Sequence, residues 1–182
     1  MRKSQIVDLL SRRLGVRTTR LTNLVQRLAE AGLLPIAKGP PYPDLTPVEI
    51  ARTLILAVTD EGLGAAQATI MKYGGLPGPG ASLEEVLGHA LSRRESLVPT
   101  RSCLEIHTGD APYAVFTVIS ADGARTLVFG DMPDVESVDR TVLISGAALF
   151  AVAQEINGMS GADVDKLLAG ATEMKPAVSA VN

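Results

Sequence analysis

Two stretches rich in proline and glycine limit what this chain of 182 residues can fold into, because helices and strands do not run through such sequences. Residues 38–44 (KGPPYPD) place three prolines around one tyrosine. Residues 74–82 (GGLPGPGAS) combine four glycines with two prolines. We expect a stiff, exposed loop at the first stretch and, at the second, a linker that divides the chain into two parts.

The part before the linker has the periodicity of amphipathic helices. Apolar residues recur every three or four positions in residues 4–14 and again in residues 18–31, which predicts one helix in each range. Residues 46–49 (TPVE) have the pattern of a capping box with proline at the first helical position, and they predict a third helix that ends near Thr59. Residues 62–73 favour a further helix.

The third predicted helix is apolar on most of its sides, which indicates that it is buried. We expect part of this burial to come from a second copy of the chain, so that residues 46–73 form a helical oligomerisation segment. The residues expected at that interface are Ile50, Leu54, Ile55 and Val58.

The part after the linker changes from the pattern of helices to that of strands. Its β-branched and aromatic runs predict strands, and Asp122-Gly123 is a hairpin turn signal. We expect an α+β domain at residues 83–175, with a small antiparallel sheet and a C-terminal helix, and then a frayed tail at residues 176–182. The predicted helices are residues 82–94, 144–157 and 162–168, and the predicted strands are residues 103–108, 113–120 and 125–129.

Residues 10–34 (LSRRLGVRTTRLTNLVQRLAEAGLL) carry the most informative pattern in the chain. Leucine and three polar positions precede Leu-Gly-Val, a polar run with hydroxyls follows, and Ala-Gly-Leu-Leu closes the pattern. This arrangement resembles the helix-turn-helix of winged-helix DNA-binding proteins and, more loosely, short prophage-type winged-helix proteins of alphaproteobacteria. The resemblance implies a winged helix-turn-helix domain at residues 1–45, with residues 18–31 as the recognition helix and the proline-rich loop as a short wing.

The charges are distributed unevenly along the chain. Residues 1–40 contain eight lysines and arginines and two acidic residues, a net charge of +6. The remaining residues contain nine lysines and arginines and eighteen acidic residues, a net charge of −9. A basic end on an acidic body favours a polyanionic partner for that end only.

A recognition helix needs an apolar side that docks on its own domain and an outer side that donates hydrogen bonds to phosphates and base edges. Asparagine and glutamine can pair with adenine, and arginine with guanine. Acidic residues are absent from the predicted recognition helix until Glu30. The residues expected to contact double-stranded DNA are Arg12, Arg13, Arg17, Thr18, Thr19, Arg20, Thr22, Asn23, Gln26, Arg27, Lys38 and Tyr42.

Three functions fit these patterns. The first is a sequence-specific transcription regulator that binds DNA as a homodimer and reads two half-sites. The second is a phage-type small terminase, the DNA-recognition subunit of a packaging machine, which would form a larger ring. The third is an adaptor whose winged helix binds only proteins. The outer side of residues 17–27 could also be an ordinary solvated helix face, although such faces normally mix both signs of charge.

Other chemistry is weakly supported by the sequence. Cys103, Glu105 and His107 alternate along one predicted strand and could offer three metal ligands, but such trios are more often ordinary strand residues. The glycine-rich residues 74–80 lack the Gly-Lys-Ser/Thr of a phosphate-binding loop. We therefore expect no enzyme, metal or cofactor. Without a signal peptide or an apolar run longer than residues 54–58, we expect a cytoplasmic protein with no membrane partner.

Overall fold

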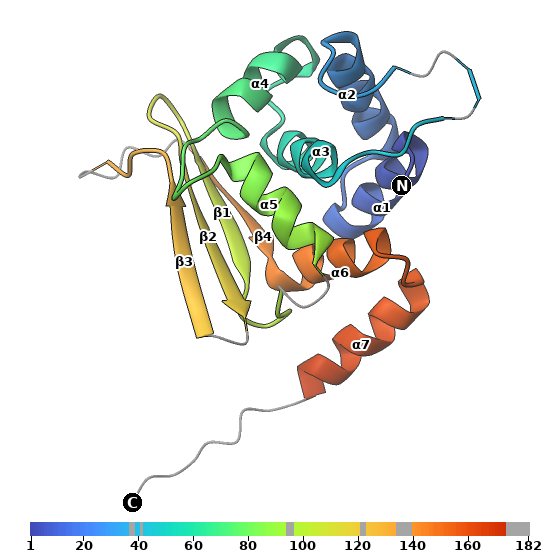
Figure 1. The fold of residues 1–182 in the computed structure, drawn as a ribbon, viewed down its shortest axis with the longest axis vertical. Helices are drawn as coiled ribbons and strands as arrows, with labels where there is room; N and C mark the ends of the chain where they lie inside the picture. The colour runs from blue at the N-terminus through green and yellow to red at the C-terminus, as the bar shows by residue number, and fades with distance from the viewer. Residues whose placement is uncertain (37–38, 41, 94–96, 121–122, 134–139, 174–182) are drawn as a thin grey trace, which may run out of the picture.

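The computed structural model describes residues 1–36, 39–40, 42–93, 97–120, 123–133 and 140–173. These residues form an α+β fold in which helices gather on one side of an antiparallel sheet (Figure 1), as the sequence predicts. The helices are α1 (Lys3–Leu14), α2 (Thr18–Glu30), α3 (Pro47–Thr59), the 3₁₀ turn η1 (Leu63–Ala65), α4 (Ala66–Tyr73), α5 (Leu83–Ser92), α6 (Gly146–Ile156) and α7 (Gly161–Glu173). The strands are β1 (Cys103–Thr108), β2 (Tyr113–Ser120), β3 (Gly123–Phe129) and β4 (Arg140–Ser145).

Helices α1 and α2 pack through their apolar faces and are joined by a turn of three residues. The turn begins at Gly15, whose backbone lies in the left-handed region at φ 69° and ψ 15°, a conformation that glycine adopts without strain. Leu21, Leu24 and Leu28 of α2 are fully buried. Within the part of the α2–α3 loop that the structure describes, no residue belongs to a strand, so this segment lacks the hairpin of a typical wing.

Helix α3 lies at the centre of the helical part (Figure 1) and contacts α1, α2, α4 and α5. Its N-terminus has the predicted capping box, in which the hydroxyl of Thr46 accepts from the Glu49 N–H and the Glu49 carboxylate accepts from the Thr46 N–H. Ile50, Leu54 and Ile55 are at most 4% exposed within the single chain. These three residues build the core of one molecule, which corrects the expectation that they form an interface between copies.

The fourth residue of the expected interface, Val58, is half-buried at the C-terminal end of α3. It lines an open hollow of about 420 Å³ together with residues of α1, β4 and α6. Val58 is therefore the only one of the four expected interface residues that the described structure leaves partly accessible.

Residues 74–82, expected to be a linker, form an ordered turn. The Gly78 N–H donates to the Ala81 carbonyl, and the Gly130 N–H at the end of β3 donates to the Pro77 carbonyl at 2.7 Å. A continuous hydrophobic core extends from α1 through α3 and α5 to the sheet and α6. The segment thus connects two parts of one core, and not two separately packed units.

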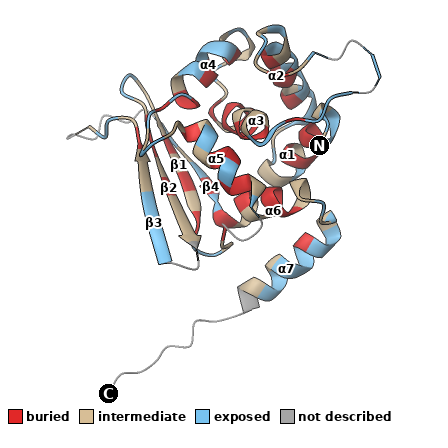
Figure 2. Ribbon diagram, in the orientation of Figure 1, coloured by how far each residue is buried: buried red, intermediate tan, exposed pale blue. Residues whose placement is uncertain are grey.

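The sheet has the strand order β3-β2-β1-β4, and all neighbours are antiparallel. Leu104 of β1 is paired with Phe116 of β2 and with Ile144 of β4, and all three side chains are buried. Helices α5 and α6 lie on the same side of the sheet (Figures 1 and 2). Strand β4 was not predicted, because Ile144 was assigned to the following helix, which begins only at Gly146.

The last described helix, α7, packs on α6 (Figure 1). It is longer than predicted and extends to Glu173, with Val164 buried near its start. The predicted hairpin turn at Asp122 and the predicted frayed tail lie outside the described residues. No helix within the described ranges is long and apolar enough to span a membrane.

Candidate nucleic-acid interface

Helix α2 has the two sides that a recognition helix requires (Figure 2). Its leucines are buried, and its other side is open to solvent. No acidic residue lies on α2 before Glu30. The structure therefore brings most of the expected DNA contacts onto one surface. Arg17, Thr18, Thr19, Thr22, Asn23, Gln26 and Arg27 are exposed, and Arg20 is half-buried.

Hydroxyl groups attach the start of α2 to α1. The Ser11 hydroxyl donates to the Val16 carbonyl at 2.7 Å and lies 2.9 Å from the Thr18 hydroxyl. One turn later, the Thr22 hydroxyl donates to the Thr18 carbonyl. Within the described part of the chain, Thr19 and Asn23 make no side-chain hydrogen bond. Their donors and acceptors are thus available to a partner.

Arg20 is held by a carboxylate that comes from another element. Its Nε donates to Asp60 Oδ2 at 2.7 Å, and its Nη2 donates to Asp60 Oδ1 at 2.6 Å. The hydrogen bond from Arg20 lowers the pKa of Asp60, against the effect of partial burial, and the Gly62 N–H adds to this lowering. Asp60 stays ionised, and the pair carries no net charge.

In the last turn of α2, the carboxylate of Glu30 neutralises the positive charge of Arg27. Arg27 Nη1 donates to Glu30 Oε2 at 2.8 Å, and Gln26 Nε2 donates to Glu30 Oε1 at the same distance. These two hydrogen bonds, the one from Gln26 foremost, lower the pKa of Glu30. Both side chains of the ion pair are about half exposed, so water and salt screen their attraction. Arg27 can leave this partner at little cost.

Arg12 and Arg13 belong to a different environment. Arg12 donates two hydrogen bonds to Glu155 of α6, and Arg13 binds both Glu155 and Asp165 of α7. Burial raises the pKa of Glu155, but hydrogen bonds from Arg12 and Arg13 outweigh it and lower that pKa. The Arg13 side chain is only 12% exposed. These arginines connect α1 with the C-terminal helices. The low exposure of Arg13 corrects its expected role as an open DNA contact, whereas the Arg12 side chain is 50% exposed and its expected contact stays a prediction.

The remaining cations lie around the start of α1 and α2. Arg17 and Arg2 are exposed, and neither has a carboxylate partner among the described residues. Lys3 donates to the Pro35 carbonyl at 2.7 Å. Arg2 and Lys3 contribute to the positive charge of residues 1–40 but are not among the expected DNA contacts. The clustering of cations at the start of the chain was the signal that could have identified them.

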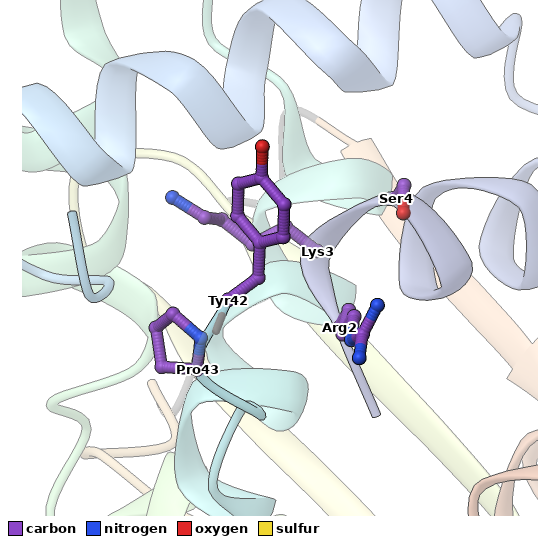
Figure 3. A pocket seen from close by; sticks show the side chains of 5 residues that line it. All are labelled: Arg2, Lys3, Ser4, Tyr42 and Pro43. Carbon is purple, nitrogen blue, oxygen red and sulfur yellow. The ribbon is translucent and has the colours of Figure 1, made fainter. Parts of the chain in front are cut away.

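Tyr42 lies beside the start of α1 (Figure 3). It is 54% exposed, and with Arg2, Lys3, Ser4 and Pro43 it lines an open hollow of about 480 Å³. The tyrosine ring of the proline-rich loop thus lines the same hollow as the side chains of Arg2 and Lys3. Lys38, the other expected contact of this loop, lies outside the described residues.

The trio on β1 has ordinary strand contacts. Its three side chains share the face of the sheet opposite Leu104 and Ile106. His107 stacks on Tyr113 with ring centroids 4.0 Å apart, and its Nδ1 lies 3.1 Å from the Thr141 hydroxyl. Among the described residues, no group of three or more potential ligands is placed to hold a metal ion.

Comparisons with known proteins add no relatives. No protein-family model, curated protein or solved structure matches the chain. The resemblance to winged-helix proteins therefore rests on the sequence pattern of residues 10–34 alone.

Proposed function

We propose that the helix pair α1–α2 binds double-stranded DNA, with α2 in the major groove. The observation that carries this proposal is the outer side of α2, which is polar and carries no carboxylate from Thr18 to Gln26. The buried leucines hold the opposite side on the body of the protein. A turn of three residues joins α2 to the preceding helix, and a short connection of this kind is compatible with a helix-turn-helix motif.

The side chains of this surface fall into two groups with different tasks. Arg17 and Arg2 are positive and have no carboxylate partner among the described residues, so they suit phosphates. Thr19 and Asn23 are neutral and lie along the exposed ridge of α2, so they suit base edges. An asparagine in this position can accept from and donate to adenine at once. The two groups predict affinity from Arg17 and Arg2, and selectivity from Asn23.

The test is a titration of the full chain with random-sequence duplex DNA between about 50 and 200 mM salt. We expect binding that weakens as salt rises. Arg17→Ala should lower the slope of log K against log salt by about 0.9, the value for one lost phosphate contact. Arg101→Ala removes an exposed arginine that precedes β1, and as the matched control it should leave the slope unchanged. Equal slopes for wild type and Arg17→Ala would contradict the proposal.

A protein-interaction adaptor is the second candidate, and one observation favours it. Four of the arginines expected to contact DNA, Arg12, Arg13, Arg20 and Arg27, have carboxylate partners within the chain. This pairing reduces the positive field that nucleic acid would meet. Absence of any DNA affinity at the lowest salt would support the adaptor and exclude the DNA-binding proposal.

Within the DNA-binding proposal, the biological role depends on the number of copies in the assembly. A regulator that reads two half-sites would be a dimer, whereas a small terminase would be a larger ring. Native mass spectrometry separates the two. Selection of bound fragments from genomic DNA provides an independent readout. A palindrome near a promoter would indicate regulation, and a direct-repeat array near a packaging site would indicate the terminase.

A further inference from the structure

The guanidinium of Arg20 is held along one edge only. The carboxylate of Asp60 takes the side edge, formed by Nε and Nη2, in two nearly parallel hydrogen bonds of 2.7 and 2.6 Å. Three N–H groups remain, two on Nη1 and one on Nη2, and none of them has an acceptor among the described residues. The end edge of the fork, between Nη1 and Nη2, is therefore available to a ligand.

Asp60 is itself fixed by its own loop. It caps α3 with an N–H that donates to the Leu56 carbonyl, and its Oδ1 accepts from the Gly62 N–H at 3.2 Å. Its φ of 23° is the only positive value of a non-glycine residue in the described ranges. Aspartate and asparagine tolerate such a conformation better than most residues. An aspartate whose backbone N–H and carboxylate each make a hydrogen bond to the protein can hold an arginine in one orientation.

The end edge of an arginine fork matches the O6 and N7 acceptors that guanine presents in the major groove. Arg20 lies in the first turn of α2, the part of a recognition helix that reaches base edges. Because the Arg20–Asp60 ion pair carries no net charge, it attracts a phosphate only weakly. Its two remaining oriented N–H donors can still form hydrogen bonds with the neutral acceptors of a base. The geometry favours guanine over the DNA backbone as the ligand of this edge.

We propose that Asp60 is a positioning residue that orients Arg20 to read one guanine in duplex DNA. This inference rests on the proposed DNA binding and adds to it a specificity-determining pair. In this arrangement, Arg20 contacts the base and Asp60 acts through Arg20. Loss of Asp60 then relaxes the choice of base at one position and leaves the contacts of Arg17 and Asn23 in place.

The experiment begins with the duplex that the wild-type chain selects from a random pool. Each guanine is then replaced in turn by 7-deazaguanine, which lacks the N7 acceptor. We expect one position at which wild-type binding weakens by about tenfold. Asp60→Asn should lose most of that difference at the same position, because an amide offers one acceptor in place of two. Glu30→Gln makes the same chemical change beside Arg27 and, as the matched control, should keep the full difference.

A second variant protects the test against misfolding. Asp60→Gly removes the carboxylate but suits the positive φ, and circular dichroism should confirm that the helices are retained. The Asp60→Gly variant should lose its preference for guanine at the same position at which Asp60→Asn loses it. A uniform loss of affinity over all positions, or an unchanged preference, in both variants would overturn the role of Asp60 and leave DNA binding intact. A wild-type chain that binds no duplex at the lowest salt would overturn both proposals.

Discussion

Arg12 and Arg13 at the end of α1 and Arg17 at the start of α2 lie close together in the chain and have different surroundings. Arg12 and Arg13 at the end of α1 are bound by Glu155 and Asp165, more than 100 residues later in the sequence. Arg17 at the start of α2 is exposed, with no carboxylate partner among the described residues. The same residue type thus holds the fold together on one helix and is open to a partner on the next. Charge counted along a sequence does not distinguish these roles.

The largest effect should come from removing the carboxylate that both α1 arginines share. Glu155→Ala removes the largely buried carboxylate and leaves the mostly buried Arg13 with the exposed Asp165 as its partner, so we expect a loss of about 3 kcal/mol in the free energy of unfolding. Urea denaturation measures this loss. Asp165→Asn, at a carboxylate that is 62% exposed, should cost less than about 1 kcal/mol. Similar costs for the two variants would show that Glu155 does not hold α6 on α1.

The next effect concerns the ridge of α2 and should be seen in DNA selectivity, not in stability. Asn23→Ala removes an exposed side chain that makes no hydrogen bond in the described structure, so the unfolding free energy should change little. We expect it to reduce discrimination at one adenine by about tenfold, measured by competition between matched duplexes. Equal discrimination before and after the substitution would remove Asn23 from the interface.

A smaller effect distinguishes the role of Arg12 from that of Arg17. Arg12→Ala should leave both DNA affinity and its salt dependence close to the wild-type values, because Arg12 is occupied by Glu155. Arg17→Ala should lower the salt slope, as described above. Anisotropy titrations of both variants under identical conditions measure the contrast. If Arg12→Ala lowers the slope as much as Arg17→Ala, the ion pair to Glu155 opens when DNA binds.

The smallest and most gradual effect should come from pH. Burial raises the pKa of Glu155 but the hydrogen bonds from Arg12 and Arg13 lower it overall, so the folded state holds this proton less tightly than the unfolded state. The stabilisation is complete well above the ordinary value of 4.5 and is lost as pH falls through the lowered pKa. The stability difference between wild type and Glu155→Gln should therefore be constant from pH 7 to 6 and shrink in acid. If the stability difference between wild type and Glu155→Gln grew in acid, the lowered pKa of Glu155 would be contradicted.

Local patterns allowed much of the helical structure to be predicted. The helices α1 and α2 and the turn at Gly15 follow from the spacing of leucines and from one glycine. The capping box at Thr46 identified the start of α3 to the residue. These signals act within four residues, so the sequence around each position contains all the information that the prediction needs.

The features that sequence reasoning missed depend on contacts between distant parts of the chain. An apolar helix such as α3 has the same pattern whether its own chain or a second copy covers it. The proline- and glycine-rich residues 74–82 would have the same sequence in a mobile linker, and their attachment to the sheet depends on a distant contact, the hydrogen bond from the Gly130 N–H to the Pro77 carbonyl. Asp60, the partner of Arg20, is 40 residues away and has no local signal.

The Ser11 hydroxyl has one more consequence. Because it bridges the turn at Val16 and the first residue of α2, the angle between α1 and α2 is set before any ligand arrives. In the proposed DNA complex, this helix pair would lose little conformational entropy on binding, so more of the contact energy would contribute to affinity. Ser11→Ala, although it touches no ligand, should weaken association through a looser hinge.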